Sequence, residues 1–164
     1  MPKPTLLFVR GDTEGAFGAI KFYWPFFYVA RLAENVGYEA HTIFTPSVDE
    51  AIDALVEADA AIFYGHGNAG KVWLQPNRKA ALVTADILTV ATRRQILGLE
   101  KMHFVHVACC ETCRDSEWVQ AWLQVTKVLR GYEVDTYDPR NPFSVPECKT
   151  YIKDVTEGTP ATQL

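Results

Sequence analysis

The apolar residues of this chain gather in short runs that are typical of buried strands. Runs bounded by polar residues, glycine or proline predict strands over residues 5–10, 38–44, 60–64 and 102–108. A fifth strand is expected over 132–137, and a small extra strand over 71–74. Because these runs are apolar throughout rather than alternating, the strands should be covered on both faces.

Amphipathic stretches lie between these runs. Apolar residues recur there three and four positions apart, which predicts helices over 25–35, 48–58, 84–97 and 116–130. Ser47 stands where the second helix needs an N-cap, and Gly37, Gly98 and Gly131 follow the ends of the other three. Alternating strands and helices predict an α/β fold: a three-layer sandwich whose mostly parallel sheet has about five to six strands and helices on both faces.

Length and composition narrow the class of protein. The chain has 164 residues, 48% of them apolar, which predicts one domain over 1–164 with a loose tail from about 156. Sixteen Lys and Arg against 20 Asp and Glu give a net charge of −4, which argues against a nucleic-acid-binding surface. No apolar run is long enough for an export signal or a membrane span, so we expect no membrane partner and a cytoplasmic location.

The cysteines are placed for chemistry rather than for a disulfide framework. Cys109, Cys110 and Cys113 crowd together, and Cys148 stands alone. Adjacent cysteines pair only with strain, so reduced thiols in a reducing compartment are the better interpretation.

A histidine and a cysteine follow two consecutive strands of the expected sheet. His66 comes just after the strand over 60–64, and Cys109 just after the strand over 102–108. Because the carboxyl ends of parallel strands meet at one edge, both side chains should open onto the same rim. An imidazole can activate a thiol and later protonate a leaving group. The N–H groups of Gly67 and Cys109 are candidate donors to an oxyanion.

This pattern resembles a known group of enzymes. An apolar strand ending in His-Gly (AAIFYGHG, 60–67) and a second ending in Ala-Cys (FVHVACC, 104–110) are similar to the caspase-like cysteine peptidases, which include caspases, metacaspases, legumains, gingipains, separases and CHAT domains. The resemblance covers about residues 5 to 137. It implies an endopeptidase with Cys109 as nucleophile, His66 as general base and acid, and Gly67 as oxyanion donor, acting on a protein or peptide.

Three alternatives remain open at this point. Cys110 is an alternative nucleophile, but strand alternation lets only one of the two adjacent thiols face His66.

The second alternative is a protein without activity. The Cys110-Glu111 pair stands where many caspases have Arg-Gly, and the chain after the fifth strand is short. Both features suit an inactive caspase-like scaffold that binds a protein partner. A possible homodimer would pair through the edge strand over 132–137.

A bound metal is the third alternative. His103, His106, Cys109, Cys110 and Cys113 fall close together, and Cys110-x2-Cys113 has the spacing of a zinc half-site. No second half-site exists, and His103 and His106 should lie on opposite faces of a strand. We therefore expect no metal and no cofactor, with His106 as a core histidine.

Charged residues after the first and fifth strands are candidates for a substrate pocket. Arg10 would favour an acidic side chain by bidentate pairing, whereas Asp12 would favour Arg or Lys. Asp135 is a similar candidate after the fifth strand. Solvated loop residues are the plainer interpretation, and among the pocket candidates Asp12 is slightly preferred.

Two groups of aromatic residues are predicted to lie in the core. Trp118 and Trp122 are one helical turn apart on the apolar face of their helix. The aromatic residues over 22–28 are expected to pack under the sheet.

Overall fold

The predicted parallel sheet is present in the computed structural model, which describes residues 2–13 and 27–132. Its strands are all parallel and run in the order β2-β1-β3-β7-β8. Their bounds are Thr5–Arg10 for β1, Glu39–Phe44 for β2, Ala60–Tyr64 for β3, Val105–Ala108 for β7 and Leu129–Arg130 for β8. The α/β prediction is therefore confirmed.

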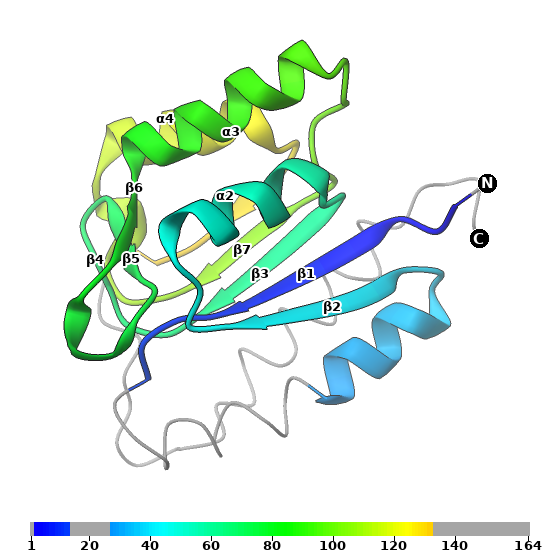
Figure 1. The fold of residues 1–164 in the computed structure, drawn as a ribbon, viewed down its shortest axis with the longest axis horizontal. Helices are drawn as coiled ribbons and strands as arrows, with labels where there is room; N and C mark the ends of the chain where they lie inside the picture. Colours follow the sequence, from blue (N-terminus) through cyan, green and yellow to red (C-terminus); the bar gives the residue numbers. More distant parts are fainter. Residues whose placement is uncertain (1, 14–26, 133–164) are drawn as a thin grey trace.

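Helices cover both faces of this sheet and make three layers (Figure 1). On one face lie α2 (Val48–Glu57), α3 (Thr84–Ile96) and α4 (Ser116–Val125). They pack on one side of the strands, where Leu7 and Val9 belong to their core cluster. Helical residues 27–35 lie on the other face, with Leu6 and Phe8 in the cluster that contains Val29. Neighbouring residues of β1 thus point to opposite cores, as the pleat requires.

The helix α2 begins where its sequence predicts. The Ser47 Oγ accepts a hydrogen bond from the backbone N–H of Glu50 at 3.2 Å, and the Glu50 carboxylate accepts one from the backbone N–H of Ser47 at 2.7 Å. These bonds hold the pKa of the Glu50 carboxyl below its ordinary value. Such a reciprocal cap fixes the start of the helix, and loss of a cap costs about 1 kcal/mol.

A second, antiparallel sheet stands at the carboxyl-terminal end of the main one (Figure 1). Its strands are β4 (Gly67–Asn68), β5 (Lys71–Trp73) and β6 (Ala81–Val83), in that order. The short 3-10 turns Pro76–Arg78 and Thr112–Arg114 complete the elements of this region. The extra strand predicted over 71–74 is therefore confirmed, whereas β4 and β6 are too short for a periodic pattern to show.

The last predicted helix needs correction. The helix expected over 116–130 ends at Val125, and β8 forms inside that range. Of the strand expected over 132–137, Tyr132 is not in a strand, and the rest stays a prediction. Thr126 is extended, with φ −125° and ψ 154°, and bridges to Met102 ahead of β7. The chain pairs with β7 over Leu129 and Arg130 instead of continuing the helix, so tertiary contact overrides the helical spacing. Residues 133–137 lie outside the described residues.

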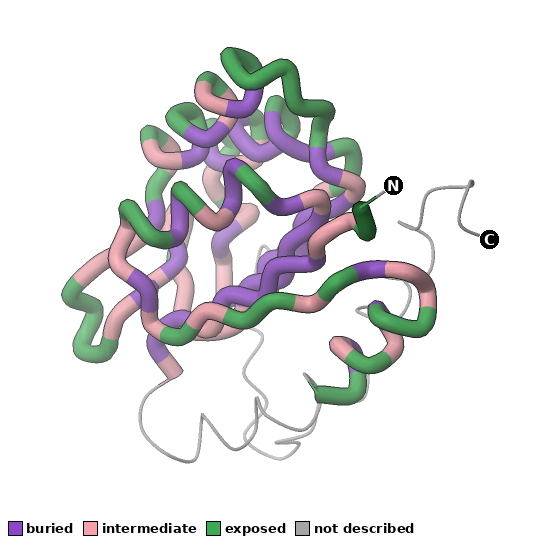
Figure 2. The backbone as a smooth tube through the Cα atoms, turned by 45° about the vertical axis from the view of Figure 1, so that its right-hand side comes forward, coloured by how far each residue is buried: buried purple, intermediate pink, exposed green. Residues whose placement is uncertain are grey.

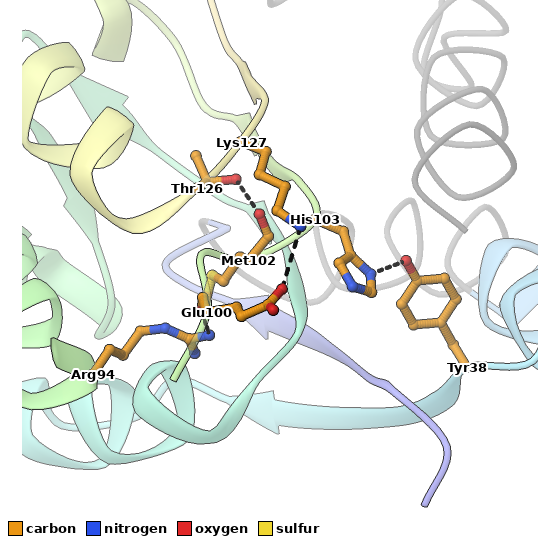
Figure 3. Close-up of polar contacts among 7 residues, drawn as sticks. All are labelled: Tyr38, Arg94, Glu100, Met102, His103, Thr126 and Lys127. Atoms are coloured by element: carbon orange, nitrogen blue, oxygen red, sulfur yellow. Dashed lines mark hydrogen bonds and ion pairs between the residues drawn. The ribbon is translucent and has the colours of Figure 1, made fainter. Parts of the chain in front are cut away.

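Side-chain hydrogen bonds to backbone carbonyls close the amino-terminal end of the sheet (Figure 3). Arg94, only 6% exposed, donates from Nη1 to the carbonyls of Leu55 (3.2 Å), Val56 (2.8 Å) and Ala58 (2.7 Å). Its Nη2 donates to the carbonyl of Glu100 at 2.5 Å. One guanidinium thus satisfies the last turn of α2 and ties it to the loop after α3.

A buried tyrosine and a histidine pair at the same end of the sheet. Burial raises the pKa of the Tyr38 phenol well above its ordinary value, so the phenol stays protonated, and its oxygen forms a hydrogen bond of 2.7 Å with His103 Nδ1. Thr126 Oγ1 donates to the carbonyl of Met102, and Lys127 pairs with Glu100 at 3.6 Å. These contacts join the entries to β2, β7 and β8.

Burial follows the layers closely (Figure 2). Trp118 and Trp122 are fully buried with their rings edge to face, 5.8 Å apart, which confirms them as core residues. The prediction for the aromatic residues over 22–28 is wrong at Phe27 and Tyr28, which are 58% and 61% exposed. These two stand at the start of helical residues 27–35 and are exposed, whereas Val29 is fully buried. Residues 22–26 lie outside the described residues.

Two further predictions concern the chain as a whole. Within the described residues, no helix is both long enough and apolar enough to cross a membrane. The assignment of residues 1–164 to one domain, with a loose tail from about 156, stays a prediction because 133–164 are not described.

Candidate active site

Three loops meet at the carboxyl-terminal end of the main sheet. They follow β1, β3 and β7, which are direct neighbours: Arg10 is paired with Tyr64, and Tyr64 with Ala108. His66 stands two residues beyond β3 and Cys109 one residue beyond β7. The two residues therefore leave adjacent strands at one edge, which is where ligands bind in open parallel sheets.

Backbone hydrogen bonds hold the first two loops together. The N–H of Gly11 donates to the carbonyl of Tyr64 at 2.8 Å, and the N–H of His66 donates to the carbonyl of Asp12 at 2.7 Å. Gly65 has φ +151°, and a Cβ atom there would lie 2.8 Å from the carbonyl oxygen of Asp12. Glycine is needed because the chain turns here in a conformation that other residues rarely adopt.

Gly67 brings the histidine loop against the cysteine loop. A Cβ atom at Gly67 would lie 2.7 Å from Cβ of Cys109, 2.9 Å from the carbonyl oxygen of Cys110 and 2.6 Å from Cγ2 of Thr112. Real side chains do not approach so closely, so only glycine allows this contact. The residue that follows His66 is thus packed directly on Cys109, and the backbone of each loop is within reach of the other.

The loop after β7 is fixed at several points. Thr112 is fully buried, and its Oγ1 donates to the carbonyl of Cys109 at 3.2 Å. Glu111 has a left-handed backbone with φ 53°, an uncommon conformation for a residue other than glycine. Asp115 then caps α4, its carboxylate accepting from the N–H groups of Glu117 at 2.8 Å and Trp118 at 3.1 Å. Cys109 is held on a short, sharply turned connection between a strand and a helix.

The two adjacent cysteines occupy different environments. Cys109 belongs to the core cluster that contains Val105 and Val107, whereas Phe104 and Ala108 belong to the opposite cluster. This confirms the alternation expected along the strand. Cys109 is fully buried, with 0% of its surface exposed, and Cys110 is partly exposed. A substrate would reach the Cys109 thiol only after a movement of the groups that cover it.

The candidate pocket residues are separated in the structure. Arg10 ends β1 and stacks its guanidinium over the Phe44 ring of the edge strand, 5.6 Å from the ring centroid. Asp12 is 4% exposed and its carbonyl is bonded to His66, so it lies closer to the candidate dyad. Asp135 lies outside the described residues. Whether Arg10 or Asp12 contacts a substrate stays a prediction.

The candidate metal ligands do not converge within the described part of the chain. There, no group of three or more His, Cys, Asp or Glu side chains is arranged to hold a metal ion. His103 forms a hydrogen bond with Tyr38 at the amino-terminal end of the sheet. It precedes β7, whereas the cysteines follow that strand. His106 is 1% exposed, and its ring centroid lies 6.3 Å from that of Tyr132.

The sequence analysis missed Trp73 as part of this region. Its N–H donates to the carbonyl of His66 at 2.9 Å, and its carbonyl accepts from the N–H of Asp12 at 2.9 Å. Trp73 thus joins the loops after β1 and β3 from the small sheet. The only signal available beforehand was the predicted strand over 71–74, which did not indicate its partners.

Comparison with solved structures decides the kind of fold. The structure is similar to the X-ray structure of a secreted C11 cysteine protease from Bacteroides thetaiotaomicron, called iotapain, with a TM-score of 0.61. The chain has a caspase-like fold. Sequence identity to iotapain is 12%, and the match covers 97% of this chain but 62% of that protease, so the chain spans less than two thirds of its length. No protein-family model matches the sequence, and no curated protein does.

The caspase-like fold accounts for the sheet and for the place of the candidate site. It confirms the resemblance proposed from the His-Gly and Ala-Cys patterns at the level of the fold. Activity, substrate and partners are separate questions, because folds of this kind host more than one function.

Proposed function

We propose that this chain is a cysteine peptidase that cuts protein or peptide substrates through a dyad of Cys109 and His66. The observation that supports this most directly is the packing of Gly67 on Cys109, which sets the histidine loop and the cysteine loop against each other. The caspase-like fold and its similarity to a C11 cysteine protease favour the same chemistry.

The proposed reaction runs through an acyl-enzyme. His66 takes the thiol proton, and the Cys109 sulfur attacks the carbonyl carbon of the scissile bond. The N–H groups of Gly67 and Cys109 donate to the oxyanion that forms. Protonated His66 gives its proton to the leaving amine, and the C–N bond breaks to leave a thioester. Water, deprotonated by His66, then hydrolyses the thioester and restores the thiol.

The burial of Cys109 supports a second candidate function. A thiol with no exposed surface suits a caspase-like scaffold that binds a protein partner without cutting it. On this alternative, partner binding would survive Cys109→Ala, and the thiol would react no faster than an ordinary cysteine, whose pKa is about 8.5.

Labelling by iodoacetamide between about pH 5 and 9, with the modified cysteine located by mass spectrometry, separates the two functions. The peptidase proposal expects fast labelling of Cys109 near pH 6, because an imidazolium stabilises the thiolate. His66→Ala should remove this reactivity, and Cys110→Ala should leave it. Slow labelling of every thiol, with no effect of His66→Ala, would contradict the dyad and favour the scaffold.

The remaining predictions about partners and location stay open. A homodimer and a cytoplasmic location are expectations from the sequence alone. The described residues neither place a second copy on the chain nor indicate a compartment.

A further inference from the structure

The small antiparallel sheet carries a cluster of positive charge around one aromatic ring. Lys71 Nζ lies 5.4 Å from the centroid of the Trp73 ring, and Arg78 Cζ lies 6.0 Å from it. Lys79 follows Arg78 and is exposed. We call Lys71, Trp73, Arg78 and Lys79 the cationic hairpin. A cation over a Trp ring is an attractive arrangement, so the Trp73 ring favours both charges near it.

The charges of the cationic hairpin are not neutralised by any described carboxylate. Among the residues that the structure describes, no carboxylate lies within ion-pair distance of Lys71, Arg78 or Lys79. Elsewhere in the same set, Arg93, Arg114 and Lys127 each have such a partner. The whole chain carries a net charge of −4, so three cations close together in the sequence and around one ring form a local concentration of positive charge.

The backbone at the hairpin loop is strained in a way that favours this cluster. Asn77 and Arg78 both have left-handed backbone conformations, with φ 59° and 57°. Asparagine tolerates this region, but an arginine adopts it at a cost of order 1 kcal/mol or more. The Arg78 guanidinium, which lies near the Trp73 ring, belongs to this left-handed pair. Strain of this kind gathers at functional positions.

The cationic hairpin is continuous with the candidate dyad. Gly67 is paired with Val72 in the antiparallel ladder, so the next pair is His66 with Trp73, joined by the N–H of Trp73 to the carbonyl of His66 at 2.9 Å. Directly opposite residues present their side chains on the same face, with Cβ atoms about 5 Å apart. Val72 is fully buried, so Lys71 and Trp73 turn to the outer face.

We propose that the cationic hairpin is a subsite for acidic side chains of the substrate, close to the bond that is cut. This rests on the proposed peptidase function, because His66 marks where the bond would lie. Carboxylates suit the site because they pair with Lys and Arg by charge-assisted hydrogen bonds. The cluster is too small, and the chain too acidic, to favour a nucleic acid.

Direct binding tests this subsite without requiring catalysis. The probe is a fluorescent peptide with three consecutive Glu residues, compared with its Gln twin, bound to the Cys109→Ala chain and followed by anisotropy. We expect the Glu peptide to bind about tenfold more tightly at low salt, and the difference to shrink at about 0.5 M NaCl. Lys71→Gln with Arg78→Gln should remove most of the difference, and Trp73→Leu part of it.

A matched control removes the same charge elsewhere. Arg31→Gln with Lys127→Gln changes two cations on the far side of the sheet and at its amino-terminal end, and should leave the preference for Glu intact. Equal binding of the two peptides, or equal loss in the hairpin and control variants, would overturn the subsite. A short RNA that binds as tightly as the Glu peptide would replace it with a general polyanion site. The labelling of Cys109 tests the dyad separately, so failure of either proposal is visible alone.

Discussion

The two ends of the parallel sheet are built by different means. At the amino-terminal end, side chains close the structure: Arg94 donates to four carbonyls, and Tyr38 forms a hydrogen bond with His103. At the carboxyl-terminal end, backbone meets backbone, and glycines at 11, 65 and 67 leave room for the approach. Left-handed residues that are not glycine, such as Glu111 and Arg78, also occur at this end.

The difference indicates that the amino-terminal end of the sheet mainly stabilises the fold, whereas the carboxyl-terminal end mainly forms the candidate site. Side-chain hydrogen bonds to helix ends stabilise the fold and leave few groups for a ligand. Close backbone approach holds Gly67 on Cys109 with no side chain between them, so N–H groups and reactive side chains stay near one another. Substitutions at the amino-terminal end should therefore change the free energy of unfolding, and substitutions at the carboxyl-terminal end should change the reactivity of Cys109.

The largest effect is expected at Arg94. Arg94→Met leaves the carbonyls of Leu55, Val56 and Ala58 without their donor in a buried setting, which should lower the free energy of unfolding by about 3 kcal/mol. Urea unfolding followed by tryptophan fluorescence measures this loss. Arg93→Met is the matched control, because Arg93 makes only an exposed ion pair with Asp53 and should cost under about 1 kcal/mol. Equal losses would contradict the assigned role.

Gly67→Ala should act on the other end. Its Cβ would meet Cys109 and Cys110, so the two loops must separate. We expect a fall of about a hundredfold in the rate of Cys109 labelling near pH 6, which corresponds to about 2.7 kcal/mol. Gly98→Ala is the control, because nothing lies within 4 Å of the Cβ position of Gly98; its φ of +67° makes it a test of backbone strain alone. A labelling rate that is unchanged in Gly67→Ala would show that the loop contact does not matter.

Tyr38→Phe should have a smaller effect on stability. It removes the hydrogen-bond partner of His103 Nδ1 without opening a cavity, which should cost about 1 kcal/mol in the free energy of unfolding. Thermal or urea unfolding measures the change, and Cys109 labelling should stay as in the wild type. Tyr28→Phe, at a tyrosine that is 61% exposed, should leave stability unaltered.

The smallest effect concerns pH. Burial lowers the pKa of His103 below its ordinary value of 6.5. Nearby charges that modify this shift are Asp59 and Glu100, which raise the pKa, and Lys127 and Arg94, which lower it. Below pH 6.5 the unfolded chain takes up a proton that the folded chain does not, so the free energy of unfolding should fall until the pH reaches the folded pKa. Above 6.5 this contribution is fully present.

The pH effect is isolated by comparing the wild type with His103→Gln. Urea unfolding between about pH 5 and 8 should show a flatter dependence in the variant, because it lacks the titrating ring. Parallel profiles in the two proteins would mean that other groups cause the slope.

Much of the fold follows from the sequence because its elements have strong local signals. The apolar runs of β1 and β3 were predicted with their observed bounds, and Ser47 was predicted as the N-cap of α2. The rule that parallel strands end at one edge also predicted that His66 and Cys109 share a rim. Each of these inferences needs only local patterning and the direction of the strands.

Other features depended on partners distant in the chain. The helical spacing over 116–130 extended too far, because the pairing of β8 with β7 ends the helix at Val125. The partners of Trp73 were invisible for the same reason, since a strand of three residues has no pattern of its own. The sequence by itself determined which residues reach the edge of the sheet. Only the tertiary structure decided that Gly67 packs on Cys109 and that Trp73 stands opposite His66, because such contacts arise from how separate loops fit together.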